Sequence, residues 1–169
     1  MLEACIMTIL DLTDAKIQSL LIKEKVVVNP RARQKHEAKH TRQDFEVKSK
    51  DGADDFRLFI RQSLVIQAGF SVGLVWISPS KEEAILMRCN GSDYLHRNRI
   101  EGSNFDEEFH IHIATERYVS AGLRAESYAE ISKDYQNVND AKHHLCRACN
   151  ISGFEKDSDE KTMSLFDRE

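Results

Sequence analysis

The sequence predicts an α+β fold in which a curved antiparallel sheet of about five strands carries an N-terminal helix and two C-terminal helices, all packed on one face. Two observations support this prediction. Apolar and polar residues alternate through much of the segment 43–115, and short turn-rich stretches interrupt the alternation. Apolar residues at helical spacing occur before and after this segment. Because short turns join strands that are consecutive in the chain, we expect the sheet to be antiparallel.

The first element is a helix over residues 10–25. Thr13 is a suitable N-cap, because its hydroxyl can accept a hydrogen bond from the first turn. The apolar residues on one face of this helix are Ile17, Leu20 and Leu21. The β-branched run 26–28 follows as a short strand or an extended exit, and Pro30 prevents a helix from continuing.

The expected strands are residues 43–49, 55–63, 71–77, 84–89 and 109–115. The pair Asp51-Gly52 predicts a tight turn between the first two strands. The Pro- and Ser-containing stretch 78–83 predicts a second turn between the next two. The pattern therefore indicates two hairpins followed by a separate fifth strand.

Helical spacing returns near the end of the chain and predicts helices over 125–135 and 139–149. We expect residues 1–153 to form a single α+β domain, with a basic connector at 23–42. The acidic residues 154–169 have few apolar positions and are expected to form a flexible tail.

Composition limits the function classes. The chain has 169 residues, 31% of them charged, a net charge of −4 and no apolar run that could span a membrane. Its start lacks the basic region of a secretory signal, so the four cysteines are expected to be reduced and the protein to be cytoplasmic, without a membrane partner. The connector 23–42 has a local net charge of +5, which favours a phosphate-bearing partner.

The strongest chemical signal is the alternation in the strand 109–115. Strand side chains point to opposite faces with period two, so His110 and His112 share the face that does not carry Phe109. The same two-residue alternation places Arg88 on that face of a neighbouring strand, and His96 lies in the connecting loop.

Such a set suits metal-free cleavage of RNA. Histidine can give or accept a proton near neutral pH, and arginine grips phosphate oxygens. We therefore take His110, His112, Arg88 and His96 as candidate catalytic residues. The candidate substrate-binding residues are Asn90, Arg97, Arg99, Arg31, Arg33 and Lys35.

Two other interpretations stay open for these histidines. His96, His110 and His112 form a possible three-histidine metal set with an open fourth position. The H-x-H spacing is common, however, and the chain has no H-E-x-x-H motif, so we expect neither a metal nor another cofactor. The histidines can also be ordinary residues on a half-solvated sheet.

The combination Arg88…Asn90…His96 followed by His110-Ile111-His112 resembles small uncharacterised bacterial families and, more distantly, the TumE-type toxins of toxin–antitoxin modules. The resemblance covers residues 55–118, and Arg-Cys-Asn stands where those toxins have Trp-Asp-Asn. It implies a small cytosolic toxin that acts on RNA and is neutralised by an antitoxin.

Two functions from different classes follow. The first is a ribonuclease-like toxin or defence protein that uses the His/Arg face. The second is a non-catalytic phage or mobile-element protein, an inhibitor or adaptor, that binds a host protein in a nucleic-acid-handling complex through its basic segment and acidic tail.

Overall fold

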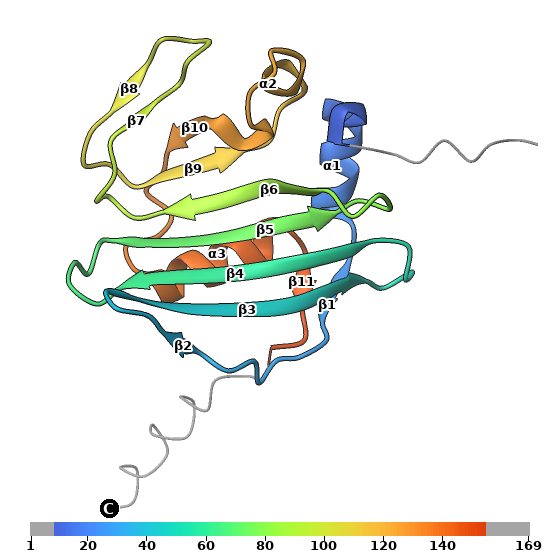
Figure 1. Cartoon of the computed structure of the whole chain (residues 1–169), viewed down its shortest axis with the longest axis horizontal. Helices are drawn as coiled ribbons and strands as arrows, with labels where there is room; N and C mark the ends of the chain where they lie inside the picture. Colours follow the sequence, from blue (N-terminus) through green and yellow to red (C-terminus); the bar gives the residue numbers. More distant parts are fainter. Residues whose placement is uncertain (1–8, 155–169) are drawn as a thin grey trace, which may run out of the picture.

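A nine-stranded mixed sheet dominates the computed structural model, which describes residues 9–154 (Figure 1). From one edge to the other the order is β10 (Tyr128–Ile131), β9 (His110–Ile113), β6 (Glu83–Asn90), β5 (Phe70–Ile77), β4 (Asp55–Ser63), β3 (His40–Ser49), β1 (Lys25–Val27) and β11 (Ile151–Ser152), with β2 (Lys35–His36) paired to β3. A separate small sheet is the hairpin of β7 (His96–Arg97) and β8 (Asn104–Phe105).

The helices of the described range are short. They are α1 (Asp14–Ile22), α2 (Glu116–Ser120) and α3 (Val138–Ala148), together with the 3₁₀ turns η1 (Ile9–Asp11) and η2 (Ala125–Ser127). None of the helices between residues 9 and 154 is long and apolar enough to cross a membrane.

The predicted α+β class, with about five antiparallel strands and three helices on one face, is wrong. The described chain is mostly β, and its sheet is mixed because β1 and β11 pair in parallel. The missed strands β2, β7, β8 and β11 are each two residues long. A strand that short has no alternation to detect, because its pairing is decided by distant parts of the chain.

The helix predicted over 125–135 is also wrong. Residues 128–131 instead form β10, which pairs antiparallel with β9 and places Ala129 opposite His112. This pairing satisfies the backbone groups along the outer edge of β9, a tertiary demand that outweighs local helical spacing.

Other elements lie close to their predicted positions. The hairpin β3–β4 turns at Gly52, whose φ of 73° suits glycine, and β5–β6 forms the second hairpin. The side chain of Thr13 caps α1 as expected. The segment 23–42 holds β1, β2 and the start of β3 rather than a connector, and the predicted tail lies outside the described residues after Phe154.

The two faces of the sheet differ in what covers them. Helix α3 packs against β4, β5 and β6 on one face and lies behind the sheet in Figure 1. The core between them includes Phe45, Leu58, Val72, Leu74, Ala141 and Leu145. The opposite face carries the histidines of β9, so it holds the candidate site.

Lys25 joins the two ends of the described chain. Its side chain is fully buried, and its Nζ donates hydrogen bonds to the carbonyl oxygens of Leu21 at 2.9 Å, Lys23 at 2.7 Å and Cys149 at 2.8 Å. These carbonyls lie at the C-terminal ends of α1 and α3, where helix groups lack partners and favour a cation.

We expect Lys25→Met to lower the free energy of unfolding by about 3 kcal/mol, because it leaves several buried carbonyl groups without a donor. Urea denaturation followed by circular dichroism measures this change. The matched control is Lys48→Met on β3, where the side chain is 57% exposed. Equal stabilities for the two variants would contradict the role given to Lys25.

Candidate functional site

Strand β9 places two imidazoles directly beside an arginine and an asparagine. In the register of β6 and β9, Arg88 lies opposite His112 and Asn90 lies opposite His110. All four side chains occupy the face of the sheet that α3 does not cover, because the alternate residues of these strands, Cys89 and Ile111, join the core.

The hairpin β7–β8 covers this face and brings the third histidine. The His96 ring stacks on His110 at 5.5 Å between centroids and meets His112 edge-on at 4.6 Å. Phe105 from β8 lies 6.2 Å from the His110 ring. The covering leaves His110 0% and His112 3% exposed, so these residues are buried rather than open to solvent.

Asn98 anchors the hairpin to the sheet. Its Nδ2 donates to the carbonyl oxygen of Ala129 at 2.8 Å, and its Oδ1 accepts from the amide of the same residue at 2.8 Å. These two hydrogen bonds to the β10 backbone fix the orientation of the Asn98 amide, because its oxygen must face the N–H of Ala129. The same Oδ1 lies 2.9 Å from Nε2 of His96, which therefore donates to it.

The hydrogen bonds assign a tautomer to each imidazole. Nδ1 of His110 donates to the Glu108 carbonyl at 2.8 Å, and Nδ1 of His112 donates to the Glu126 carbonyl at 2.8 Å. A carbonyl oxygen only accepts, so the proton is on the nitrogen that faces it. In the neutral tautomers that these bonds select, the nitrogen with the free lone pair is Nε2 in His110, Nε2 in His112 and Nδ1 in His96.

The environment keeps the buried pair neutral. Burial lowers the pKa of His112 to about 3, and the neighbouring Arg88 charge lowers it further. Burial also lowers the pKa of His110, with smaller contributions from His96 and Arg88. At neutral pH these imidazoles can accept a proton or bind a cation, but they have no proton to give as acids.

Arg88 carries a positive charge into the same space. Its Nε is buried and has no hydrogen-bond partner within residues 9–154. Burial lowers its pKa from the usual value, and the nearby Glu126 charge opposes that shift. A guanidinium stays protonated in proteins, so it remains a donor that an anion can satisfy.

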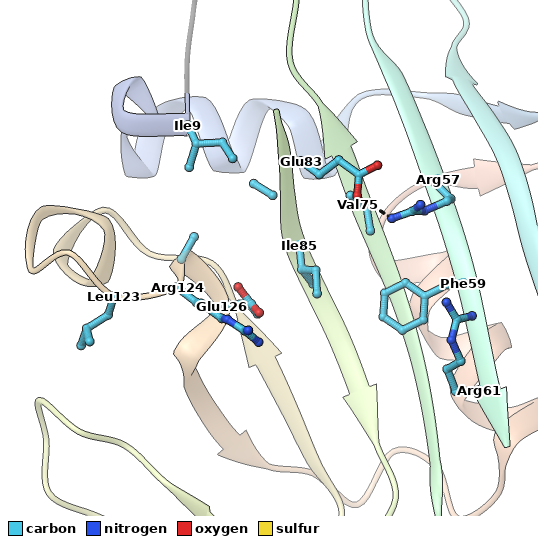
Figure 2. Close-up of a pocket in the computed structure, with 12 residues that line it drawn as sticks. Ile9, Arg57, Phe59, Arg61, Val75, Glu83, Ile85, Leu123, Arg124 and Glu126 are labelled. Carbon is cyan, nitrogen blue, oxygen red and sulfur yellow. Dashed lines mark hydrogen bonds and ion pairs between the residues drawn. The ribbon is translucent and has the colours of Figure 1, made fainter. Parts of the chain in front are cut away.

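Two adjoining cavities extend from these groups across the sheet. The first, which we call the His cavity, has a volume of about 430 Å³ and is lined by the three histidines with Arg88, Asn90, Ser71, Phe59, Arg61, Tyr94 and Leu95. The second, which we call the Arg cavity, has a volume of about 550 Å³ and shares Phe59 and Arg61 with the first. Figure 2 shows Arg57, Phe59 and Arg61 along β4 on one side of the Arg cavity and Arg124 and Glu126 on the other.

The structure brings together half of the residues proposed from the sequence. His96, His110, His112, Arg88 and Asn90 all line the His cavity. Arg97 and Arg99 are exposed around the hairpin and line neither cavity. Arg31, Arg33 and Lys35 are exposed near β1 and β2, whereas the histidines lie near the opposite edge of the sheet.

Several residues of the site were missed by sequence reasoning. Arg57, Phe59 and Arg61 alternate along β4 with Leu58, so the sequence pattern places them on the face opposite Leu58. Their part in the site could not be inferred, because it depends on the order of the strands in the sheet. Nothing in the sequence marks Asn98 as an anchor or Glu126 as a cavity residue. Their roles come from the pairing of β10 with β9, and the segment was expected to be helical.

The comparisons with known proteins place the chain in a family without assigning an activity. A model of the family of unknown function DUF6978 matches residues 12–151, so the chain belongs to that family. This agrees with the expected uncharacterised family. No curated protein and no solved structure matches the chain significantly, and a relationship to the TumE-type toxins is not shown.

The stability of the chelator-treated protein should fall as the pH decreases below about 6.5, the ordinary pKa of histidine. His112 has a pKa of about 3 in the folded protein, so the unfolded chain takes up the proton first and unfolding becomes easier. This linkage amounts to about 2 kcal/mol between pH 7 and pH 5. Urea titrations at both pH values in EDTA measure it, and His112→Gln should show a smaller loss than wild type. Equal losses would contradict the neutral state of His112.

Asn98→Ala should loosen the hairpin over the site, because it removes both hydrogen bonds to Ala129 and the acceptor of His96. We expect the amides of residues 96–105 to exchange hydrogen faster, with a loss of about 2 kcal/mol in unfolding free energy. Hydrogen exchange with mass spectrometry measures the exchange of these amides, and urea denaturation measures the unfolding free energy. Asn104→Ala, at an exposed position on the same hairpin, is the control, and unchanged exchange in the Asn98 variant would refute the anchor.

Proposed function

We propose that this member of the DUF6978 family binds RNA in the His and Arg cavities and cleaves it, acting as a ribonuclease-like toxin or defence protein. The observation that carries the proposal is the buried Nε of Arg88, which has no hydrogen-bond partner among the described residues and lies beside a cluster of three imidazoles. Family membership supplies no activity, so the argument depends on the chemistry of the cavity.

The first support is the charge of the site. A buried guanidinium N–H without a hydrogen-bond acceptor is costly, and its retention favours an anion that binds there. The Nε of Arg57 is also buried without a hydrogen-bond partner among the described residues, although the Nη2 of the same guanidinium donates to Glu83 at 2.7 Å. A phosphate group matches guanidinium geometry, because its oxygens accept two parallel N–H donors.

The second support is the length of the site. The two cavities share Phe59 and Arg61, so a ligand bound at Arg88 can continue toward Arg57 and Arg124. A single phosphate would use only the first part of this path. Phe59 lies between the arginines with its ring 5.1 Å from the Arg61 guanidinium. Alternating cations and an aromatic ring suit a single-stranded nucleic acid, whose phosphates and bases alternate.

The third support is the protonation state of the imidazoles. Cleavage of RNA begins when the 2′-hydroxyl loses its proton, and a neutral imidazole can accept this proton or hold a Lewis acid that assists its loss. The expectation that the two β9 histidines act as a matched acid and base is not favoured, because burial keeps both neutral in the free protein. A phosphate bound at Arg88 would offset the repulsion from that charge and raise both pKa values.

Arg88→Gln should reduce cleavage of a fluorescently labelled single-stranded RNA by about 100-fold, because it removes the anchor of the scissile phosphate. Gel analysis of cleavage products under single-turnover conditions gives the rate. The variant should fold, since the buried Nε of Arg88 donates no hydrogen bond to any described residue, and thermal denaturation checks this. The control is Arg147→Gln, an exposed position on α3 across the sheet.

The alternative function predicts a different pattern. Arg33 and Lys35 are exposed far from the cavities, as a docking surface for a host protein requires. Under that alternative, the double variant Arg33→Glu with Lys35→Glu abolishes capture of a host protein. Wild type and Arg88→Gln then give the same amount of RNA cleavage product. This second pattern, or RNA cleavage by Arg88→Gln at the wild-type rate, would overturn the proposed function.

A further inference from the structure

We propose that His96, His110 and His112 form a binding site for one divalent transition-metal ion, with zinc the best match, and that the open coordination position faces the His cavity. This inference deepens the proposed function, on which its catalytic meaning depends. It replaces the metal-free chemistry expected from the sequence.

The first argument is the convergence of the ligand atoms. One nitrogen from each imidazole lies within 4.8 Å of the other two. Zinc binds imidazole nitrogen at about 2.0–2.1 Å, so the nitrogens of a tetrahedral site are about 3.3 Å apart. The separation has to shrink by up to about 1.5 Å on binding, and His96 belongs to the short hairpin rather than to the large sheet.

The second argument is the hydrogen bonding around the three rings. Each imidazole donates its N–H to a protein oxygen: Glu108 and Glu126 supply main-chain carbonyls, and Asn98 supplies its side-chain oxygen. Metal-ligating histidines ordinarily have such partners, which hold the tautomer and the ring orientation. All three lone pairs are then available, and the long 3.4 Å contact from Asn90 to His110 Nε2 is the interaction that a metal would replace.

The third argument is that core packing alone does not account for these rings. Three imidazoles in contact, two of them almost completely buried, contribute less to a core than apolar side chains of similar size. Within residues 9–154, a hydrogen bond shorter than 3 Å satisfies one nitrogen of each ring. A metal ion would use the remaining nitrogens together, which explains why polar rings cluster at this position.

The charges around the site favour an anion on the open position. The three ligands are neutral, so a bound metal keeps its full positive charge, and Arg88 adds a further cation next to His112. A phosphate oxygen on the metal would balance both charges, while Arg88 holds a second oxygen of the same group. The metal would then act as a Lewis acid on the phosphate that the proposed function requires.

The test uses the full chain without an affinity tag, stripped with EDTA and dialysed. Titration with Zn²⁺ in a calorimeter should show one ion per chain, and Co²⁺ should give a visible spectrum of nitrogen coordination without a thiolate charge-transfer band. His96→Gln should weaken zinc binding by at least about 100-fold, because it removes a ligand. His36→Gln, at an exposed position on β2, is the matched control and should bind as wild type.

The inference is overturned if zinc does not bind at one ion per chain, if His96→Gln binds zinc like wild type, or if a thiolate band appears. Since His96 lies on the covering hairpin, its substitution should leave the sheet folded, and thermal denaturation checks this. The two proposals fail separately. Zinc bound through His96 with no effect of Arg88→Gln on RNA cleavage refutes the proposed function alone. Absent zinc binding together with loss of cleavage in Arg88→Gln refutes the metal site alone.

Discussion

The pairing of the Asn98 amide with the backbone of Ala129 is the constraint on which the site depends. It holds the hairpin β7–β8 against the outer part of the sheet and orients His96 through the same oxygen. Without this anchor the histidines of β9 would lie on an exposed sheet face, where imidazoles have ordinary properties. With it they are buried, neutral and in contact with a third ring.

The architecture places the main apolar core and the candidate site on opposite faces of the sheet. Helix α3 and the apolar residues of the central strands form the core on one side. The other side carries a line of arginines from Arg57 to Arg88 and ends at the histidines. Because strand side chains alternate, the same residues that build the core fix the position of the charged groups. Lys25 joins the helix ends on the core side and leaves the other face available for a ligand.

Local signals in the sequence were enough to identify the central hairpins, the N-cap of α1 and the apolar stripe of α3. They also placed Arg88, His110 and His112 on one face, because that inference needs only the period of a strand. They failed for residues 125–135, where Tyr128 and Ile131 have helical spacing but belong to a strand. The pairing of this segment with β9 depends on backbone groups that no residue pattern records.

The sequence by itself determined which face of each long strand the candidate residues occupy, since alternation is a property of the local backbone. Tertiary structure alone decided that the histidines are buried, that Asn98 and Glu126 belong to the site, and that the basic segment around Arg33 does not. The physical reason is that burial, tautomer and pKa are set by groups from other strands, and their proximity depends on strand order.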